Sequence, residues 1–276
     1  MNAASDPILD LPPLRDVIRD AGLQATKALG QNFLLDLNLT GSIARLNGDL
    51  AGKSVVEIGP GPGGLTRALL LEGAKEVHAV EFDARAVEAL QPLVDAAQGR
   101  LMLHHKDALE IDIAGLADKP AVISNLPYNV ATPILINLLK NIERIDFMLL
   151  MFQKEVADRI VAKPDSKTFG RLSVMCQWLC KTKSVKTLPP SAFTPPPKIH
   201  SSVVLFQPKR ESDQPKFETM EKILAVAFNQ RRKMLRSSLG DYAAHLAEAG
   251  IDETLRAEDV PVADYVRLAK IVEASS

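Results

Sequence analysis

Three segments of the chain carry residue types at spacings that could do chemistry. The first runs Glu57-Ile58-Gly59-Pro60-Gly61-Pro62-Gly63-Gly64, and the second is Glu81, which follows Gly59 by 22 residues. Glycine adopts positive φ and lets a backbone approach a ligand closely. Glycines at 59, 61 and 64, with an acidic residue about 20 positions on, are typical of a site for a nucleoside-type cofactor whose ribose hydroxyls bind the carboxylate. A tight strand-to-helix turn without a ligand is the alternative interpretation.

The loop alone leaves two cofactor classes open. Pro60 and Pro62 remove two backbone N–H groups that a pyrophosphate would need, which counts against a nicotinamide dinucleotide. S-adenosylmethionine has no phosphate, and its cationic sulfonium is compatible with Glu57 at the head of the loop. The pattern therefore favours S-adenosylmethionine. Asp107, just beyond a predicted strand, is placed to accept from the adenine amine or, equally, to cap the segment that follows it.

The third segment, Ser124-Asn125-Leu126-Pro127-Tyr128, ends another predicted strand. Ligands of open parallel sheets bind beyond the carboxyl ends of the strands. The Asn125 amide oxygen and the Leu126 carbonyl can accept from the two hydrogens of an amine, and the Tyr128 ring can stack on a base. Alone, the segment is equally consistent with an ordinary proline turn. Beside the glycine loop and Glu81, it indicates part of a functional site.

The elements that must position these segments alternate along most of the chain. Strands are predicted at 54–58, 76–80, 101–105, 121–124, 146–152 and 201–206, and helices at 14–21, 64–72, 84–97, 133–141, 155–160 and 171–181. This alternation indicates the α/β class, with a parallel sheet covered on both faces. Residues 208–215 are typical of a linker, and only helices are predicted after it, at 217–228, 231–239, 242–249 and 262–272. We therefore expect a cofactor-binding catalytic domain at 1–208 and a smaller all-helical domain at 209–276.

Composition excludes several classes of protein. The 276 residues are 46% hydrophobic and 24% charged, which is ordinary for a soluble globular protein. No apolar run is long enough for a membrane span, and the N-terminus lacks the pattern of a secretory signal, so we expect a cytoplasmic protein with no membrane partner. Cys176 and Cys180, the only cysteines, are expected on one helix face, buried and inert. Without clustered histidines, no metal is expected.

The net charge of −1 hides an uneven distribution. Residues 1–149 carry a net charge of −6, residues 150–238 of +10 and residues 239–276 of −5. A positive middle third predicts a polyanionic partner such as nucleic acid, with a solvated lysine-rich surface as the alternative.

The segment Asn125-Leu126-Pro127-Tyr128 resembles the signature of methyltransferases that act on exocyclic amines of nucleobases. Further stretches are similar to those of the bacterial small-subunit (16S) ribosomal RNA adenine dimethyltransferases, at residues 29–34, 153–156, 169–174, 190–198 and 228–233. The ordered set runs from about residue 29 to 270, so the resemblance covers nearly the whole chain.

The resemblance implies a Rossmann-like S-adenosylmethionine-dependent methyltransferase sheet and dimethylation of two adjacent adenosines in a loop near the 3′ end of 16S ribosomal RNA, with a role in small-subunit biogenesis. It implies a monomer whose partner is the small ribosomal subunit. The implied cofactor residues are Asn32, Leu34, Gly59, Glu81, Asp107 and Asn125, and the implied catalytic residues are Asn125, Leu126, Pro127 and Tyr128. In this setting the basic residues expected to hold RNA phosphates are Lys198, Arg231, Arg232 and Lys233, the last three at the head of a predicted helix.

Three alternatives are weighed against this interpretation. A large-subunit ribosomal RNA adenine methyltransferase of the antibiotic-resistance type would share the sheet and the tetrapeptide, but residues 193–198 and 229–233 favour the small-subunit enzyme. A nicotinamide-dependent oxidoreductase would explain residues 54–81 but not Asn125 to Tyr128. A non-enzymatic ribosome assembly factor would not need the intact cofactor residues.

Overall fold

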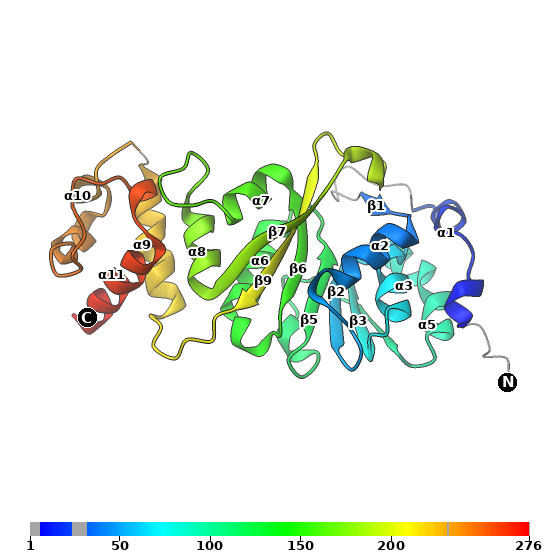
Figure 1. The fold of residues 1–276 in the computed structure, drawn as a ribbon. Coiled ribbons are helices and arrows are strands. Elements are labelled where there is room, and N and C mark those ends of the chain that lie inside the picture. The colour runs from blue at the N-terminus through cyan, green and yellow to red at the C-terminus, as the bar shows by residue number, and fades with distance from the viewer. Residues whose placement is uncertain (1–5, 24–31, 231, 276) are drawn as a thin grey trace. The chain divides into compact units, whose positions relative to one another are not determined.

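The computed structural model describes residues 6–23, 32–230 and 232–275, drawn in colour in Figure 1. It divides into two compact units, one of Met1–Lys154 with Ser184–Leu205, the other of Glu155–Lys183 with Phe206–Ser276. These units differ from the predicted domains 1–208 and 209–276 at Glu155–Lys183, which clusters with the C-terminal helices. Residues 208–215 begin at the end of the last strand of the sheet, so their composition indicates a boundary there. Nothing in their sequence indicates that residues 155–183 belong to the second unit.

The first unit is built on a sheet of seven strands in the order β4-β3-β2-β5-β6-β9-β7. These strands are β2 (Ser54–Ile58), β3 (Glu76–Glu81), β4 (Leu101–His105), β5 (Ala121–Asn125), β6 (Met148–Gln153), β7 (Cys180–Leu188) and β9 (Ser201–Pro208). The five strands from β4 to β6 in this order pair in parallel. The predicted parallel α/β sheet is therefore confirmed, and the predicted bounds at 54–58 and 101–105 are those observed.

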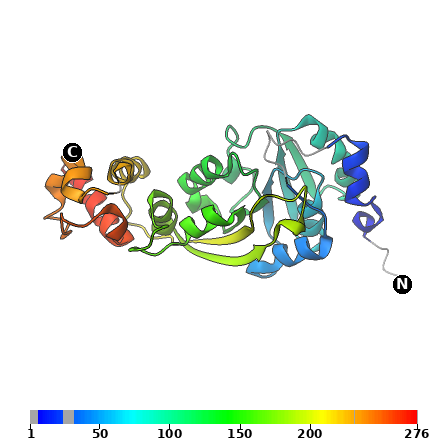
Figure 2. The ribbon, with the colours of Figure 1, turned by 90° about the horizontal axis from the view of Figure 1, so that it is seen from above.

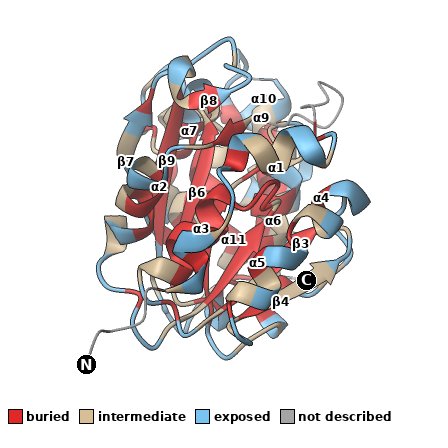
Figure 3. Cartoon of the chain, turned by 90° about the vertical axis from the view of Figure 1, so that its right-hand side faces the viewer, coloured by how far each residue is buried: buried red, intermediate tan, exposed pale blue. Residues whose placement is uncertain are grey.

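Helices cover this sheet because the central strands carry apolar side chains on both of its faces. On one face, side chains of α2 (Leu37–Ala44), α3 (Gly64–Leu71) and α5 (Gln91–Ala96) join Val55, Val77 and Ile123 of the strands in one buried cluster. Figure 1 shows α2 and α3 lying across the sheet, and Figure 3 shows its central strands largely buried, whereas β7 at the edge is mostly exposed or half-buried. The remaining helices of this unit are α1 (Leu14–Asp20), α4 (Ala84–Ala89) and α6 (Ala131–Lys140), with short 3-10 turns at Pro7–Asp10, Arg45–Asn47, Ile113–Gly115, Ile142–Arg144 and Pro190–Ala192.

Several predicted elements were wrong in detail. The helix expected at 84–97 is two helices, because Pro92 occupies the first turn of α5 and cannot continue the hydrogen bonding of α4. The helix expected at 171–181 ends at Leu179, and Cys180 begins β7, which sequence periodicity did not indicate. Cys176 and Cys180 therefore do not share one helix. Both are buried as expected, and burial raises the pKa of each thiol.

The second unit is mostly helical. Its helices are α7 (Lys154–Ile160), whose first residue belongs to the first unit, α8 (Arg171–Leu179), α9 (Phe217–Asn229), α10 (Leu235–Ser238) and α11 (Val262–Ala274), with 3-10 turns at Gly240–His245 and Ala257–Asp259. Figures 1 and 2 show α9 and α11 side by side. Ring contacts hold this core: Trp178 of α8 meets Phe217 of α9, and Phe228 of α9 meets Tyr265 of α11. The helix expected at 231–239 is only the short α10 in the described residues.

Candidate functional site

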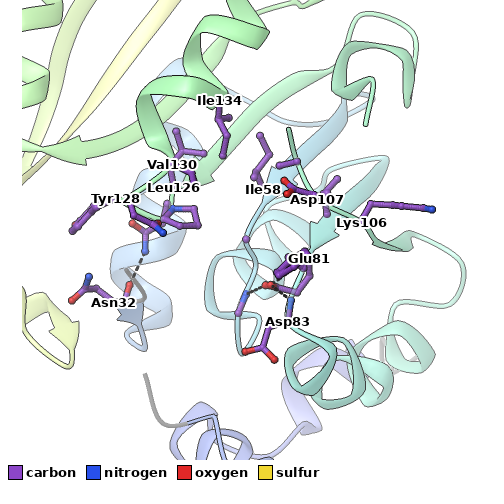
Figure 4. A pocket seen from close by; sticks show the side chains of 18 of the residues that line it. Asn32, Ile58, Glu81, Asp83, Lys106, Asp107, Leu126, Tyr128, Val130 and Ile134 are labelled. Atoms are coloured by element: carbon purple, nitrogen blue, oxygen red, sulfur yellow. Dashed lines mark hydrogen bonds between the residues drawn. The ribbon is translucent and has the colours of Figure 1, made fainter. Parts of the chain in front are cut away.

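A crevice opens at the carboxyl ends of the central strands, where the strand order reverses. β2 lies between β3 and β5, and its pairing with β5 is confined to Val55 and Val56. Beyond that point the Ser124 hydroxyl donates to the Ile58 carbonyl at 2.5 Å and holds the two strand ends together. The pocket in Figure 4 lies at these ends and is lined by residues from both halves of the sheet. This is the position at which open α/β sheets bind ligands.

The glycine loop follows β2 and forms one wall of the pocket. Gly59 has a φ of +68°, and a Cβ there would lie 3.3 Å from the ring of Pro127. Gly61 has a φ of +54°, and a Cβ there would lie 2.7 Å from the Phe33 ring. Side chains at these positions would be strained and would push Phe33 and Pro127 away. The loop is glycine-rich because two other pocket-lining segments approach its backbone closely.

Glu81 ends β3, and its carboxylate is fixed by backbone groups. Its Oε1 accepts from the N–H groups of Phe82 and Asp83 at 2.9 Å each, and its Oε2 accepts from Gly61 at 3.1 Å. Burial raises the pKa of Glu81, and these backbone hydrogen bonds oppose that rise. Because a carboxylate has about four acceptor positions, three bonds leave room for one further donor. The carboxylate lines the pocket and is held ready for a ligand hydroxyl.

Glu57 lies beneath the loop rather than in the pocket. It is 2% exposed, and the Thr66 hydroxyl donates to its Oε2 at 2.6 Å. Desolvation raises its pKa to about 8; the Thr66 hydrogen bond opposes the rise and the Glu81 charge adds to it. Glu57 was considered as a neighbour of the cationic sulfonium, but it is not among the residues that line the pocket.

Asn125 faces the glycine loop across the crevice. Its Nδ2 donates to the Asn32 carbonyl at 2.8 Å, and this bond fixes which way the amide points. The other end, Oδ1, is buried and has no hydrogen-bond partner among the described residues. A buried acceptor without a partner costs free energy, which a ligand donor would recover. The pocket is thus prepared for an N–H or O–H group at this atom.

Leu126, Pro127 and Tyr128 continue from Asn125 and also line the pocket. Tyr128 is partly buried, and its hydroxyl makes a hydrogen bond of 2.5 Å with the Ser201 hydroxyl. Burial raises the pKa of Tyr128, and the bond to Ser201 opposes that rise. The tetrapeptide therefore presents an amide oxygen and a neutral phenol ring to one space.

Asp107 caps the segment that follows it and also lies at the pocket. Its Oδ1 accepts from the Leu109 N–H at 2.8 Å, and its side chain lines the pocket. Asn32 lines it too, from the segment just before β1 (Phe33–Leu34), which pairs with β8 (Phe193–Thr194). Sequence analysis missed the apolar part of the wall, which consists of Phe33, Ile58, Val80, Phe82, Ala108, Val130 and Ile134. Phe82, which is 65% exposed, could have been noticed as a large apolar residue directly after Glu81.

The structure does not place Leu34 among the lining residues. It is buried behind the loop, and its carbonyl oxygen lies 2.1 Å from where a Cβ on Gly64 would be. Of the basic residues expected on RNA, Lys198 is exposed in the loop before β9. Arg232 and Lys233 are exposed in the turn before α10, so the expected helical setting was wrong. Arg231 lies outside the described residues.

The described residues lack two features. No group of three or more histidine, cysteine or acidic side chains is placed to hold a metal ion. No described helix has the length and apolar character needed to cross a membrane.

Comparisons with known proteins agree with one another. The family model described as ribosomal RNA adenine dimethylase matches residues 22–274. Ribosomal RNA small subunit methyltransferase A of Rhodospirillum rubrum is 51% identical over 99% of this chain and 96% of its own. The protein of the same name from Cereibacter sphaeroides is 53% identical over 94% of this chain and 96% of its own.

Solved structures show the same fold at low sequence identity. A dimethyladenosine transferase from Plasmodium falciparum superposes with a TM-score of 0.74 at 22% identity, covering 87% of this chain and 96% of that one. The 23S rRNA methyltransferase ErmE superposes with a TM-score of 0.68 at 23% identity, covering 88% of this chain and 100% of that one.

Proposed function

The chain belongs to the ribosomal RNA adenine dimethylase family, and from this membership and the pocket we propose that it dimethylates two adjacent adenosines of small-subunit ribosomal RNA. The proposed targets are the exocyclic amines in a loop near the 3′ end of 16S RNA, and the proposed setting is small-subunit biogenesis. The single observation that carries the chemistry is the buried Asn125 Oδ1, an acceptor without a partner that lies at the carboxyl end of β5.

We propose that the pocket holds S-adenosylmethionine, which supplies an electrophilic methyl group when bound. Glu81 would accept from a ribose hydroxyl, and Asp107 would accept from the adenine amine. Gly59 would let the loop backbone approach, and Ile58, Phe82 and Ile134 would enclose the flat base in apolar surface. Asn32 would border the cofactor from the N-terminal side. Leu34 would act indirectly, by supporting the loop at Gly64.

The chain's own residues can activate the target amine by positioning it. Its lone pair is delocalised into the ring, so the free amine is a weak nucleophile. Asn125 Oδ1 and the Leu126 carbonyl would accept from the two amine hydrogens and turn the lone pair towards the methyl donor. Tyr128 would stack on the base, a contact that contributes ~1–3 kcal/mol. Rate enhancement then comes from orientation rather than from a strong general base.

The target base must leave its stack to reach Asn125, so the substrate is single-stranded or flipped at that position. Lys198, Arg231, Arg232 and Lys233 are the proposed phosphate contacts. The observations that support this are the net charge of +10 over residues 150–238 and the exposure of the three of these residues that the structure describes. We further propose that the protein works as a monomer in the cytoplasm, without a metal.

The alternatives now differ in support. The relatives that exceed 50% identity carry the small-subunit name, which favours that substrate over large-subunit RNA. A nicotinamide oxidoreductase would not account for the match of residues 22–274 to the ribosomal RNA adenine dimethylase family. A purely non-enzymatic assembly role leaves the prepared pocket unexplained.

The direct test is methylation of small subunits that lack this modification, using methyl-labelled S-adenosylmethionine. We expect label in two adjacent adenosines near the 3′ end of 16S RNA. Label in large-subunit RNA alone, or none in any RNA, would contradict the proposal.

A further inference from the structure

A serine far along the chain is bonded to the tyrosine of the proposed target pocket. The Tyr128 and Ser201 hydroxyl oxygens lie 2.5 Å apart, although 73 residues separate them in the sequence. Ser201 is fully buried at the first position of β9. The residue before it, His200, accepts a backbone hydrogen bond from Lys154 at 2.9 Å, which fixes the start of the strand next to the end of β6. Ser201 is therefore a rigid partner for the phenol.

A hydrogen bond at this atom restrains the ring in two ways. The Tyr128 backbone is held by the turn that follows β5, where the Val130 N–H donates to the Pro127 carbonyl. Fixing the hydroxyl at the far end of the ring holds the ring axis between β5 and β9. A phenol O–H also prefers the plane of its ring, because the oxygen lone pair is conjugated with it. Whichever hydroxyl donates, the bond to Ser201 Oγ therefore restrains the ring plane as well as its position, because the phenol oxygen also accepts in that plane.

We propose that Ser201 is a positioning residue, which fixes the plane of Tyr128 so that the target base stacks where Asn125 Oδ1 can reach its amine. This inference rests on the proposed function. Stacking itself needs the ring and not the hydroxyl. The hydroxyl has a role here because an in-line methyl transfer tolerates only small errors in the orientation of the amine.

The neighbouring serine provides a matched comparison. Ser202 is also buried, at 1% exposure, and its hydroxyl makes a 3.2 Å hydrogen bond with that of Thr187. Successive residues of a strand point to opposite faces, so Ser202 faces away from Tyr128. Removing the Ser201 hydroxyl leaves Tyr128 without its hydrogen bond, and removing the Ser202 hydroxyl leaves Thr187 without its own. Of these two partners, only Tyr128 lines the pocket.

The test measures single-turnover methylation of unmodified small subunits by the full chain and by the variants Ser201→Ala, Tyr128→Phe, the double variant and Ser202→Ala. One neutral hydrogen bond corresponds to a factor of about 2–13. We expect Ser201→Ala and Tyr128→Phe each to lower the rate by about that factor, with Ser202→Ala close to the parent. The KM for subunits and the affinity for S-adenosylmethionine should stay within about twofold of the parent values. Subunit binding depends on the proposed phosphate contacts, and cofactor binding depends on other residues of the pocket.

The double variant decides between positioning and a general structural effect. If Ser201 acts through the Tyr128 hydroxyl, the double variant is no slower than about the slower single variant. Losses that multiply, or a folded Ser201→Ala variant with the parent rate, would overturn the proposal. If Ser201→Ala does not fold, Tyr128→Phe still tests it, and a parent rate there overturns it too. Failure of the proposed function itself would appear separately, as absence of label with the parent protein.

Discussion

Replacing Asn125 by alanine should impair methyl transfer far more than it impairs cofactor binding. The side chain makes two separable contributions. Its Nδ2 donates to the Asn32 carbonyl at 2.8 Å, and its buried Oδ1, which has no partner among the described residues, is the proposed acceptor for the substrate amine. Loss of the first is the loss of one neutral hydrogen bond, ~0.5–1.5 kcal/mol, which weakens cofactor binding by a factor of about 2–13 if Asn32 loosens completely.

The loss of Oδ1 is larger because it acts on the reacting amine. Removing one preorganised hydrogen-bonding group from an active site lowers kcat by about 10²–10³. We therefore expect Asn125→Ala to lose two to three decades in single-turnover rate and at most about one decade in S-adenosylmethionine affinity. Asn141 gives a control, since its amide also donates to a backbone carbonyl, that of Asn137, and it does not line this pocket.

The assay pairs calorimetry of S-adenosylmethionine binding with rapid-quench methylation of unmodified small subunits. A rate within threefold of the parent for Asn125→Ala would refute the role of Oδ1. A loss of cofactor affinity as large as the loss in rate would show that Asn125 acts mainly on cofactor binding, through its hydrogen bond to Asn32.

Three further outcomes are expected. Glu81→Ala should weaken S-adenosylmethionine binding by about 10–150-fold, the range for one hydrogen bond to a charged group, and calorimetry showing an unchanged affinity would remove Glu81 from the cofactor site. Glu57→Gln should gain stability over the parent as pH rises. Burial raises the pKa of Glu57 from 4.5 to about 8 in the folded parent. The protonated carboxyl therefore contributes its full share of the folding free energy below pH 4.5, and this contribution is lost as the pH rises to about 8. Urea titrations should show the free energy of unfolding of the variant, relative to the parent, growing by ~1.4 kcal/mol per pH unit in that window. A constant difference would mean that Glu57 is not neutral in the folded protein. Neutralising Arg232 and Lys233 together should weaken subunit binding and reduce the slope of log affinity against log salt by roughly 1.4, and a loss of affinity at unchanged slope would assign these residues to folding instead.

The sequence was most informative where one short segment carries its own physical reason. The glycine loop, Glu81 and residues 125–128 were identified because each lies at the end of a predicted strand, and parallel strands end at one edge of a sheet. Of these residues, Ile58, Gly59, Gly61, Glu81 and residues 125–128 line the pocket. Among the elements, β2 and β4 were predicted to the residue, because a short apolar run followed by a turn has few other interpretations.

The sequence was least informative where the outcome depends on what packs against a segment. Residues 180 and 181 were predicted to end a helix and residues 182–188 were given no element, yet residues 180–188 form β7, which lies beside β9 in the sheet. Protonation of Glu57 depends on burial under the loop, on Thr66 and on Glu81 together. The bond from Tyr128 to Ser201 joins residues that no local pattern connects.

These nonlocal contacts explain why residue 125 is an asparagine rather than an acid. An aspartate there would set an ionised oxygen against the Asn32 carbonyl, and it would either be protonated or turn away. The amide instead donates to that carbonyl and keeps an acceptor for the substrate. Asn32 directly precedes β1, whose pairing with β8 at Phe33 and Leu34 holds the acceptor carbonyl in place. Under the proposed function, the small two-stranded sheet of β1 and β8 would therefore contribute to orienting the amine, because it holds the carbonyl that determines which end of the Asn125 amide faces the pocket.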